Sequence, residues 1–228
     1  MNQKANLIRA DLKTPRAAAI AGIVFSVLMI SGLSLIRLSL PANPLEAGTW
    51  LRTSSGTVAH TLYLVPFAGI AFLWFIGVLR DRLGEFEDRF FSTVFFGSGL
   101  LFLAMLFTSA ALAGGIIVAY RARPVALFDS ATYILARDVG YEIMNLYAVK
   151  MAAVFMISTC TLAIRTGFIA RWIAFLGYAL ALFLLLSGRY VAWVIMVFPL
   201  WVLLVSIYIL IDNLHRPSQA GAAALKRV

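Results

Sequence analysis

Long runs without charge dominate this sequence and restrict the folds that are open to it. A helix needs about 20 mainly apolar residues to cross the ~30 Å hydrocarbon core of a bilayer. Six such runs lie between clusters of charged residues, at 17–36, 57–79, 90–119, 143–164, 172–188 and 190–211. The sequence therefore predicts an all-α polytopic membrane bundle of six transmembrane helices, built as a single domain over residues 1–228.

Composition supports lipid as the main solvent of this chain. Of the 228 residues, 62% are hydrophobic and 13% are charged, and the mean hydropathy is +0.93. A soluble domain carries about 25% charged residues because its surface must be hydrated. The single cysteine, Cys160, also excludes an internal disulfide framework.

Arginine and lysine predict the orientation of the chain, because they accumulate in cytoplasmic loops. One side of the predicted bundle carries twelve of them: Lys4, Arg9, Lys13, Arg16, Arg80, Arg82, Arg89, Arg165, Arg171, Arg216, Lys226 and Arg227. The other side carries six: Arg37, Arg52, Arg121, Arg123, Arg137 and Arg189. Both termini are therefore expected in the cytoplasm. The net charge of +9 is explained by topology and by anionic lipid headgroups, and no nucleic-acid partner is expected.

Two stretches allow more than one interpretation. Residues 172–211 fit either a tight antiparallel hairpin of two spans or one buried span with a re-entrant piece. The stretch from Ser130 to Glu142 fits either a short interfacial helix capped by Ser130 or an outward extension of the fourth helix. The stretch 217–228 is expected to form a disordered tail.

The usual catalytic and cofactor patterns are missing from the sequence. The two histidines, His60 and His215, lie near opposite membrane surfaces and cannot share a haem iron or join Cys160 in a zinc site. All ten acidic residues fall in loops or at the ends of spans, which argues against a buried carboxylate pair. No phosphate-binding glycine motif is present. We therefore expect no cofactor and no metal, and the sequence favours a protein that is not an enzyme.

Lys150 is the only charged residue inside a predicted span. An ammonium at that depth costs about 2.5 to 3.5 kcal/mol on insertion scales, so a partner, water or a function is expected. Eight residues separate it from Glu142, which places it about 12 Å deep and close to the midplane. The alternative is that its long side chain snorkels toward the headgroups.

Other polar or helix-breaking positions fall at the same predicted depth as Lys150. Proline removes a helical hydrogen bond and frees the carbonyl four residues earlier. Tyr147 shares the face of Lys150, whereas Asn145 lies about 140° away around the helix. The sequence thus predicts an outward-facing ligand cavity centred on Lys150, with these further members: Tyr147, Thr108, Ser109, Tyr178, Pro66, Pro199, Leu62 and Ile195.

Two segments resemble small bacterial six-helix integral membrane proteins of unknown function. In the segment from Val154 to Tyr178, one helix ends in Arg165-Thr166-Gly167 and the next begins with Arg171-Trp172. The segment from Arg80 to Leu101 is similar to the same group. The resemblance implies a multi-pass protein of the bacterial inner membrane and implies no activity.

Three functions are compatible with these features. The first is a protein that binds or conducts a small polar or anionic ligand through the cavity at Lys150. The second is a non-catalytic subunit or scaffold, whose partner in the bilayer is another membrane subunit or a second copy. A lipid-modifying membrane enzyme comes third, because no nucleophile–base pair or metal cluster is evident.

Overall fold

The computed structural model describes residues 2–39, 49–83, 89–122, 130–167, 169–187 and 193–225, and it describes side chains within 17–213 only. All elements in these ranges are helical, and no strand occurs among them. They are α1 (Asn2–Ser39), α2 (Thr49–Thr53), α3 (Ser55–Leu83), α4 (Arg89–Ala122), α6 (Ala131–Glu142), the π-helical segment η2 (Ile143–Ala148), α7 (Val149–Thr166), α8 (Arg171–Leu186), the 3-10 turn η3 (Val194–Met196) and α9 (Val197–Leu225).

The described helices define a multi-pass membrane protein. Five stretches in them are long and apolar enough to cross a bilayer: Ala17–Ser39, Ser55–Arg80, Thr93–Ala122, Ala131–Thr166 and Val194–Asn213. The remaining predicted span, the fifth at 172–188, corresponds to α8, which has 16 residues and is about 24 Å long. This length falls short of the ~30 Å core, so a count of six full spans goes beyond what the helix lengths establish.

The fourth span is the lower part of a longer helix. Ser130 caps the N-terminus of α6, because its side chain accepts a hydrogen bond from the backbone N–H of Thr132 at 3.2 Å. From there α6, η2 and α7 follow one another without a break. Of the two interpretations of the stretch 130–142, the structure therefore has the outward extension. At the other end of the chain, α9 is helical as far as Leu225, into the stretch expected to be disordered.

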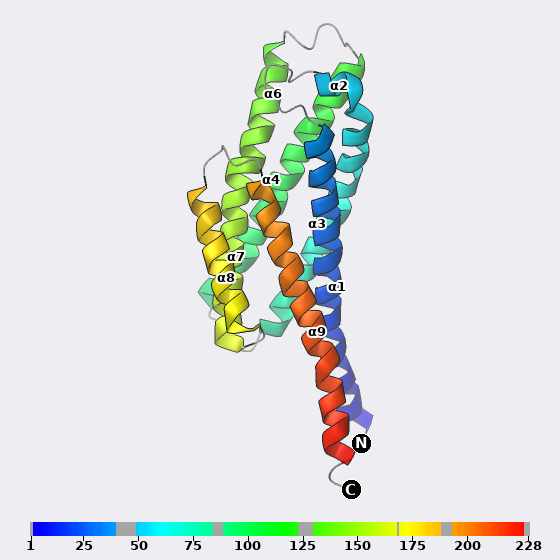
Figure 1. Cartoon of the computed structure of the whole chain (residues 1–228), viewed down its shortest axis with the longest axis vertical. Helices are drawn as coiled ribbons and strands as arrows, with labels where there is room; N and C mark the ends of the chain where they lie inside the picture. The colour runs from blue at the N-terminus through cyan, green and yellow to red at the C-terminus, as the bar shows by residue number, and fades with distance from the viewer. Residues whose placement is uncertain are drawn as a thin grey trace.

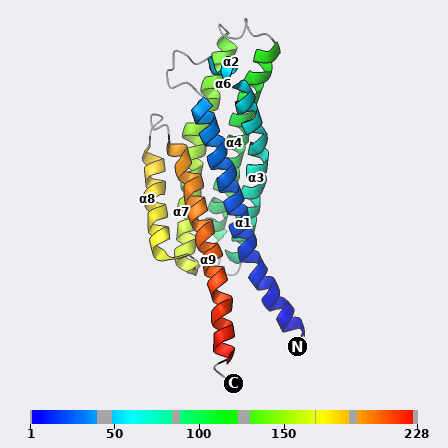
Figure 2. The ribbon, with the colours of Figure 1, turned by 45° about the vertical axis from the view of Figure 1, so that its right-hand side comes forward.

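The helices are arranged with both termini at one end of the molecule (Figure 1). α1 packs along α3 and α9, and α4 packs against α3, α6, η2 and α7. α8 lies at the flank and packs mainly against α7, as the turned view also shows (Figure 2). The upper part of α6 and the ends of α3 and α4 extend beyond the level at which α8 ends and α9 begins (Figure 1).

Close packing of aromatic rings fills the centre of the bundle. Phe25, Phe72, Phe102 and Phe198 come from α1, α3, α4 and α9, and each is at most 3% exposed. Their ring centroids lie 4.6 to 6.4 Å apart. Lipid tails give helices no hydrophobic reason to associate, so dense van der Waals packing of this kind must hold them together.

Small residues allow the close helix approaches that this packing requires. A Cβ atom added at Gly22 would collide with Ser206 and Phe75, and one at Gly177 would collide with Cys160 and Trp201. These glycines therefore fix the crossings of α1 with α3 and α9, and of α8 with α7 and α9. Gly167 ends α7 with φ of +69°, a left-handed conformation that glycine adopts without strain.

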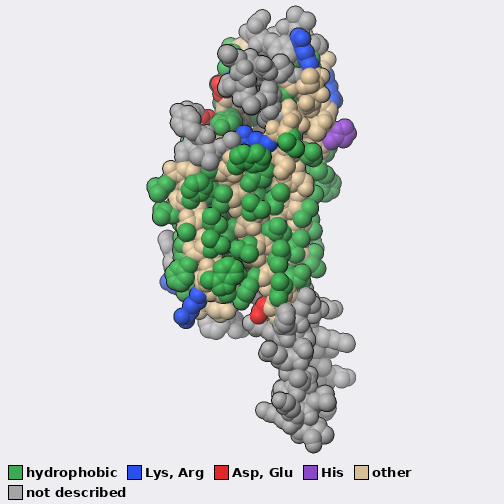
Figure 3. Space-filling model, in the orientation of Figure 1, with side chains coloured by type: hydrophobic (Ala, Val, Ile, Leu, Met, Phe, Trp, Pro, Cys, Tyr) green, Lys and Arg blue, Asp and Glu red, His purple; other side chains and the backbone are tan. Residues whose placement is uncertain are grey.

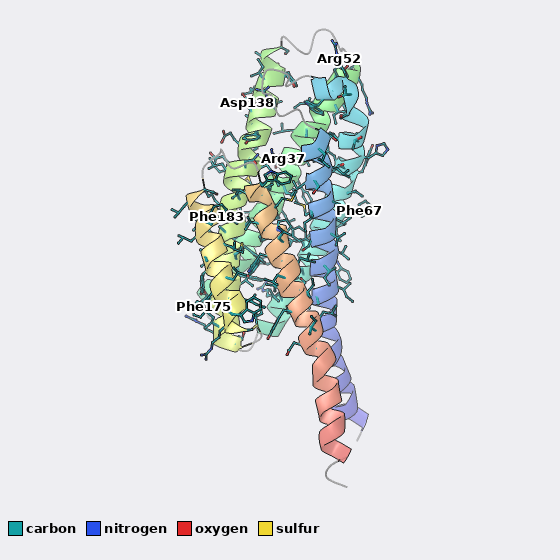
Figure 4. All side chains as sticks on the ribbon, viewed as in Figure 1. Arg37, Arg52, Phe67, Asp138, Phe175 and Phe183 are labelled. Carbon is teal, nitrogen blue, oxygen red and sulfur yellow. The ribbon has the colours of Figure 1, made fainter. Side chains whose placement is uncertain are left out.

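The surface has the distribution expected in a bilayer. Hydrophobic side chains cover the visible faces of α1, α8 and α9, and Lys and Arg side chains show only above and below this cover (Figure 3). Large apolar side chains on the outside include Phe67, Phe175 and Phe183, which are 62%, 64% and 46% exposed. Figure 4 labels these three side chains, Phe67 on α3 and the other two on α8.

Candidate functional site

Lys150 is hydrogen-bonded to the C-terminal end of α8. Its ammonium group donates hydrogen bonds to three backbone carbonyls, of Leu184 at 2.9 Å, Leu185 at 2.6 Å and Ser187 at 2.8 Å. The last carbonyls of any helix lack partners within the helix, and they carry its partial negative charge. One ammonium has three N–H donors, so these three carbonyls use its full capacity.

The length of α8 explains why a charge is needed at this point. Because α8 is only about 24 Å long, a hydrocarbon core of ~30 Å that contains it would enclose its last carbonyls, and an unsatisfied group there costs several kcal/mol. Fifteen residues separate Lys150 from Arg165 at the opposite boundary, which places Lys150 about 22 Å from that surface. Lys150 thus lies at the level of the C-terminal end of α8, to which its ammonium is hydrogen-bonded.

This geometry differs from the cavity expected around Lys150. Lys150 does not line either of the described cavities, and the carbonyls that it contacts belong to α8, not to proline-containing helices. Pro199 is the third residue of α9, where the missing N–H would have no helical partner in any case. Pro66 lies inside α3 with its side chain exposed.

The other predicted site residues divide between the cavity and elsewhere. Leu62, Ser109 and Ile195 line one common cavity. Thr108 is exposed and donates to the carbonyl of Ala104 on its own helix, and Tyr147 is 55% exposed. The hydroxyl of Tyr178 lies 2.7 Å from that of Thr161, where it joins α8 to α7. A ligand-binding role for these residues stays a prediction.

The cavity has a volume of about 500 Å³ and lies in the half of the bundle away from the termini. Its walls come from α1, α3, α4 and the α6–η2 segment, and Ile195 of η3 reaches it from below. Along α1 the lining runs from Leu28 to Arg37, and along α4 from Leu106 to Ile116. Nine or ten residues of helix correspond to a depth of about 15 Å.

The polarity of the cavity lining changes between the inner end and the mouth. The inner end is formed by apolar side chains such as Met29, Ala68 and Leu106, whereas Arg37, Arg137 and Asp138 lie at the mouth. Figure 4 shows Arg37 at the end of α1 and Asp138 on α6, both toward the end opposite to the termini. The cavity therefore offers an apolar interior beneath a charged entrance.

Most polar side chains on the lining are already engaged within the protein. Thr61 donates to the carbonyl of Thr57 at 2.9 Å, Ser109 to that of Gly140 at 2.9 Å, and Asn145 to that of Tyr141 at 2.9 Å. Arg137 forms an ion pair of 2.9 Å with Asp138. These contacts use the single donor of each hydroxyl and one N–H of Asn145, and they neutralise the charge of Arg137.

Arg37 is the exception at the entrance. Its side chain is half-buried, and within the part of the chain that the structure describes it has no hydrogen-bond or ion-pair partner. A guanidinium has five N–H donors in a fixed planar fork that matches carboxylate and phosphate groups. Arg37 is therefore the group best placed to meet an anion.

Sequence reasoning assigned Arg37 to topology alone and placed Asn145 on a face away from Lys150. The second inference agrees with the structure, because Asn145 lines the cavity and Lys150 does not. A signal for Arg37 was available: it follows a 20-residue apolar run directly, so it must lie at the end of a span. The sequence does not reveal that residues of α3, α4 and α6 line a cavity together with Arg37.

The fold and the site define a multi-pass helical membrane protein with one large amphipathic cavity among the described residues. No group of three or more potential metal-ligating side chains occurs in those residues. Comparison of the chain with protein-family models, with curated proteins and with solved structures finds no match. Function must therefore be inferred from the cavity itself.

Proposed function

We propose that this membrane protein binds a small anionic ligand in the cavity between α1, α3, α4 and α6. The observation that carries the proposal is the guanidinium of Arg37, which borders the cavity without a partner among the described residues. An isolated cation at the entrance of an apolar cavity attracts an anion strongly, because the surrounding dielectric is low. The cation of this site is Arg37 and not Lys150.

The proposal includes the topology of the chain. Both termini lie in the cytoplasm of a bacterial cell, α8 is a shortened span that brings the number of spans to six, and the cavity opens to the outside. The excess of arginine and lysine on the side of the termini supports this orientation. The ammonium of Lys150 supports α8 as a span, since it satisfies the carbonyls that a short helix leaves inside the apolar layer.

Binding fits the cavity better than conduction. One helical turn below its inner end lie the rings of Phe25, Phe72, Phe102 and Phe198, one from each of four helices. These buried rings contact one another and form an apolar layer between the cavity and the side of the termini. A ligand that enters the cavity from outside is therefore stopped by this layer of phenylalanine rings.

Thiol labelling tests whether the cavity admits anions. In a Cys160→Ser background, Ala110→Cys places a thiol on the cavity wall, and Ala104→Cys places one on the exposed side of the same helix. A sulfonate-bearing methanethiosulfonate applied from outside should modify position 110 and not position 104. It should also react faster than the ammonium-bearing analogue, because Arg37 attracts the sulfonate.

Three outcomes would contradict the proposal: an unreactive thiol at position 110, equal labelling at both positions, or equal rates for the two reagents. The Arg37→Gln variant adds a check on the source of the preference. It should bring the rates of the sulfonate and ammonium reagents together at position 110.

A further inference from the structure

The shape of the cavity restricts the kind of anion that suits it. The lining extends about 15 Å below Arg37, as the residue spacing along α1 and α4 gives. A small hydrated anion held by Arg37 would occupy only the outer end of that length. The inner end would then hold water in contact with leucine, methionine and alanine side chains, which offer it few hydrogen bonds.

A ligand with an apolar chain would displace this poorly hydrogen-bonded water from the inner end of the cavity. Met29, Ala68, Leu106 and Ile195 surround the inner end, and the phenylalanine rings close it. Such a wall stabilises a hydrocarbon chain by excluding water from both surfaces. The polarity of the cavity therefore follows the polarity of an amphiphile, with the charged group outward and the chain inward.

Volume indicates how many chains fit. A water molecule has a share of about 30 Å³ in the liquid, and a methylene group is of similar size. The cavity of about 500 Å³ thus holds on the order of 16 such groups, which suffices for one chain and a headgroup. The two chains of a bilayer phospholipid exceed this space.

We infer that the ligand is a single-chain anionic amphiphile, whose carboxylate or phosphate binds Arg37 and whose hydrocarbon chain fills the inner cavity. This inference rests on the proposed function and makes its ligand class specific. The anionic group has two sources, a free fatty acid or a single-chain phosphate lipid. Arg37 recognises the oxygen atoms that the two share.

Protection of the thiol at position 110 tests the inference. The full-length Cys160→Ser, Ala110→Cys protein is placed in phosphatidylcholine nanodiscs and titrated separately with dodecanoate, dodecyl phosphate, dodecanol and acetate. Dodecanoate or dodecyl phosphate should protect the thiol at concentrations at least about tenfold lower than dodecanol or acetate do, because only they combine the charge with the chain. The better of the two identifies the source of the headgroup.

Variants at Arg37 connect this protection to the guanidinium. Arg37→Gln should raise the concentration of dodecanoate needed for protection at least about tenfold, and Arg37→Lys should raise it less, because it keeps the charge without the planar fork. Arg121→Gln is the matched control, since Arg121 is exposed at the end of α4 and does not line the cavity. It should leave protection unchanged.

The outcomes separate the two proposals. If acetate protects as well as dodecanoate, or dodecanol as well as dodecanoate, the amphiphile inference is overturned while a ligand cavity remains. If the thiol at position 110 reacts with no reagent before any addition, the proposed function itself fails. Equal protection in the Arg37→Gln and parent proteins, with both folded by circular dichroism, also overturns the inference.

Discussion

Two cations in the same half of this bundle have opposite surroundings. Lys150 lies inside a span and donates to three carbonyls, so its ammonium has no capacity left for a ligand. Arg37 lies at the end of a span, borders a cavity and has no partner among the residues with described side chains. The comparison teaches that depth in the membrane alone does not identify a functional charge. Its hydrogen-bond partners must be known as well.

The largest expected effect follows from removing the charge that holds α8. Among the described residues, Lys150→Met leaves the carbonyls of Leu185 and Ser187 without a side-chain donor and that of Leu184 with only the hydroxyl of Ser187, and we expect the free energy of unfolding to fall by about 3 kcal/mol. Unfolding in a mixed-micelle titration with sodium dodecyl sulfate measures this change. Labelling of the thiol at position 110 should be unaffected in the protein that remains folded.

The neighbouring Met151→Leu variant is the control for Lys150→Met, because it conserves volume at a half-buried position of the same helix. It should cost less than about 1.5 kcal/mol. A Lys150→Met protein that is as stable as the parent but no longer reacts with the sulfonate reagent at position 110 would contradict this assignment. Lys150 would then be the group that binds the anion.

Arg37→Gln should weaken ligand binding and leave stability nearly unchanged, which is the opposite of the effects expected for Lys150→Met. We expect its affinity for an anionic probe such as dodecanoate to fall by about 2 kcal/mol, since a charge-assisted hydrogen bond contributes about 1.5 to 3 kcal/mol. The free energy of unfolding should change by less than about 0.5 kcal/mol, because no described contact is lost. Parallel binding and unfolding measurements check both values, and a large loss of stability would assign Arg37 to the fold.

A smaller effect is expected at the contact between α7 and α8. Thr161→Val removes the hydroxyl that lies 2.7 Å from the hydroxyl of Tyr178. Interhelical hydrogen bonds in membranes average about 0.6 kcal/mol, so the free energy of unfolding should fall by about that amount. If Thr161→Val costs as much as Lys150→Met, the anchoring of α8 is shared and does not depend mainly on the ammonium.

The smallest effect concerns the ion pair at the mouth. Asp138→Asn removes the carboxylate that pairs with Arg137 at 2.9 Å, and both side chains are substantially exposed, at 40% and 56%. Such pairs contribute little, so stability should change by less than about 0.5 kcal/mol. Without this ion pair, the positive charge of Arg137 should raise the affinity for dodecanoate about twofold. An unchanged affinity would show that Arg37 acts alone.

The sequence predicted the helical architecture well because the bilayer imposes a simple rule. Apolar runs of sufficient length must become helices, and the structure has helices at every predicted span. The helix boundaries were harder to predict. The change from apolar to mixed composition near Glu142 predicts the start of the span there, whereas the helix itself begins eleven residues earlier, at Ala131 after the Ser130 cap.

The candidate site was predictable only in part, for a physical reason. Counting residues gives the depth of Lys150, but the partners of its ammonium are backbone carbonyls 34 to 37 residues away, which carry no pattern of their own. Leu62, Ser109 and Ile195, which the residue count assigns to a similar depth, line one cavity, and their role in binding stays a prediction. The direction of each side chain depends on how helices pack, and hydropathy does not encode this.

The π-helical segment η2 joins these two regions along one continuous helix. A π turn holds one residue more than the α-helical hydrogen-bond pattern allows, and each residue corresponds to about 100° of rotation. Before this segment, Gly140 accepts a hydrogen bond from Ser109 beside the cavity; after it, Lys150 reaches α8. The additional residue thus sets the phase between these two contacts. A single deletion between Ile143 and Ala148 would bring the helix back into regular register and force one contact out of alignment with the other.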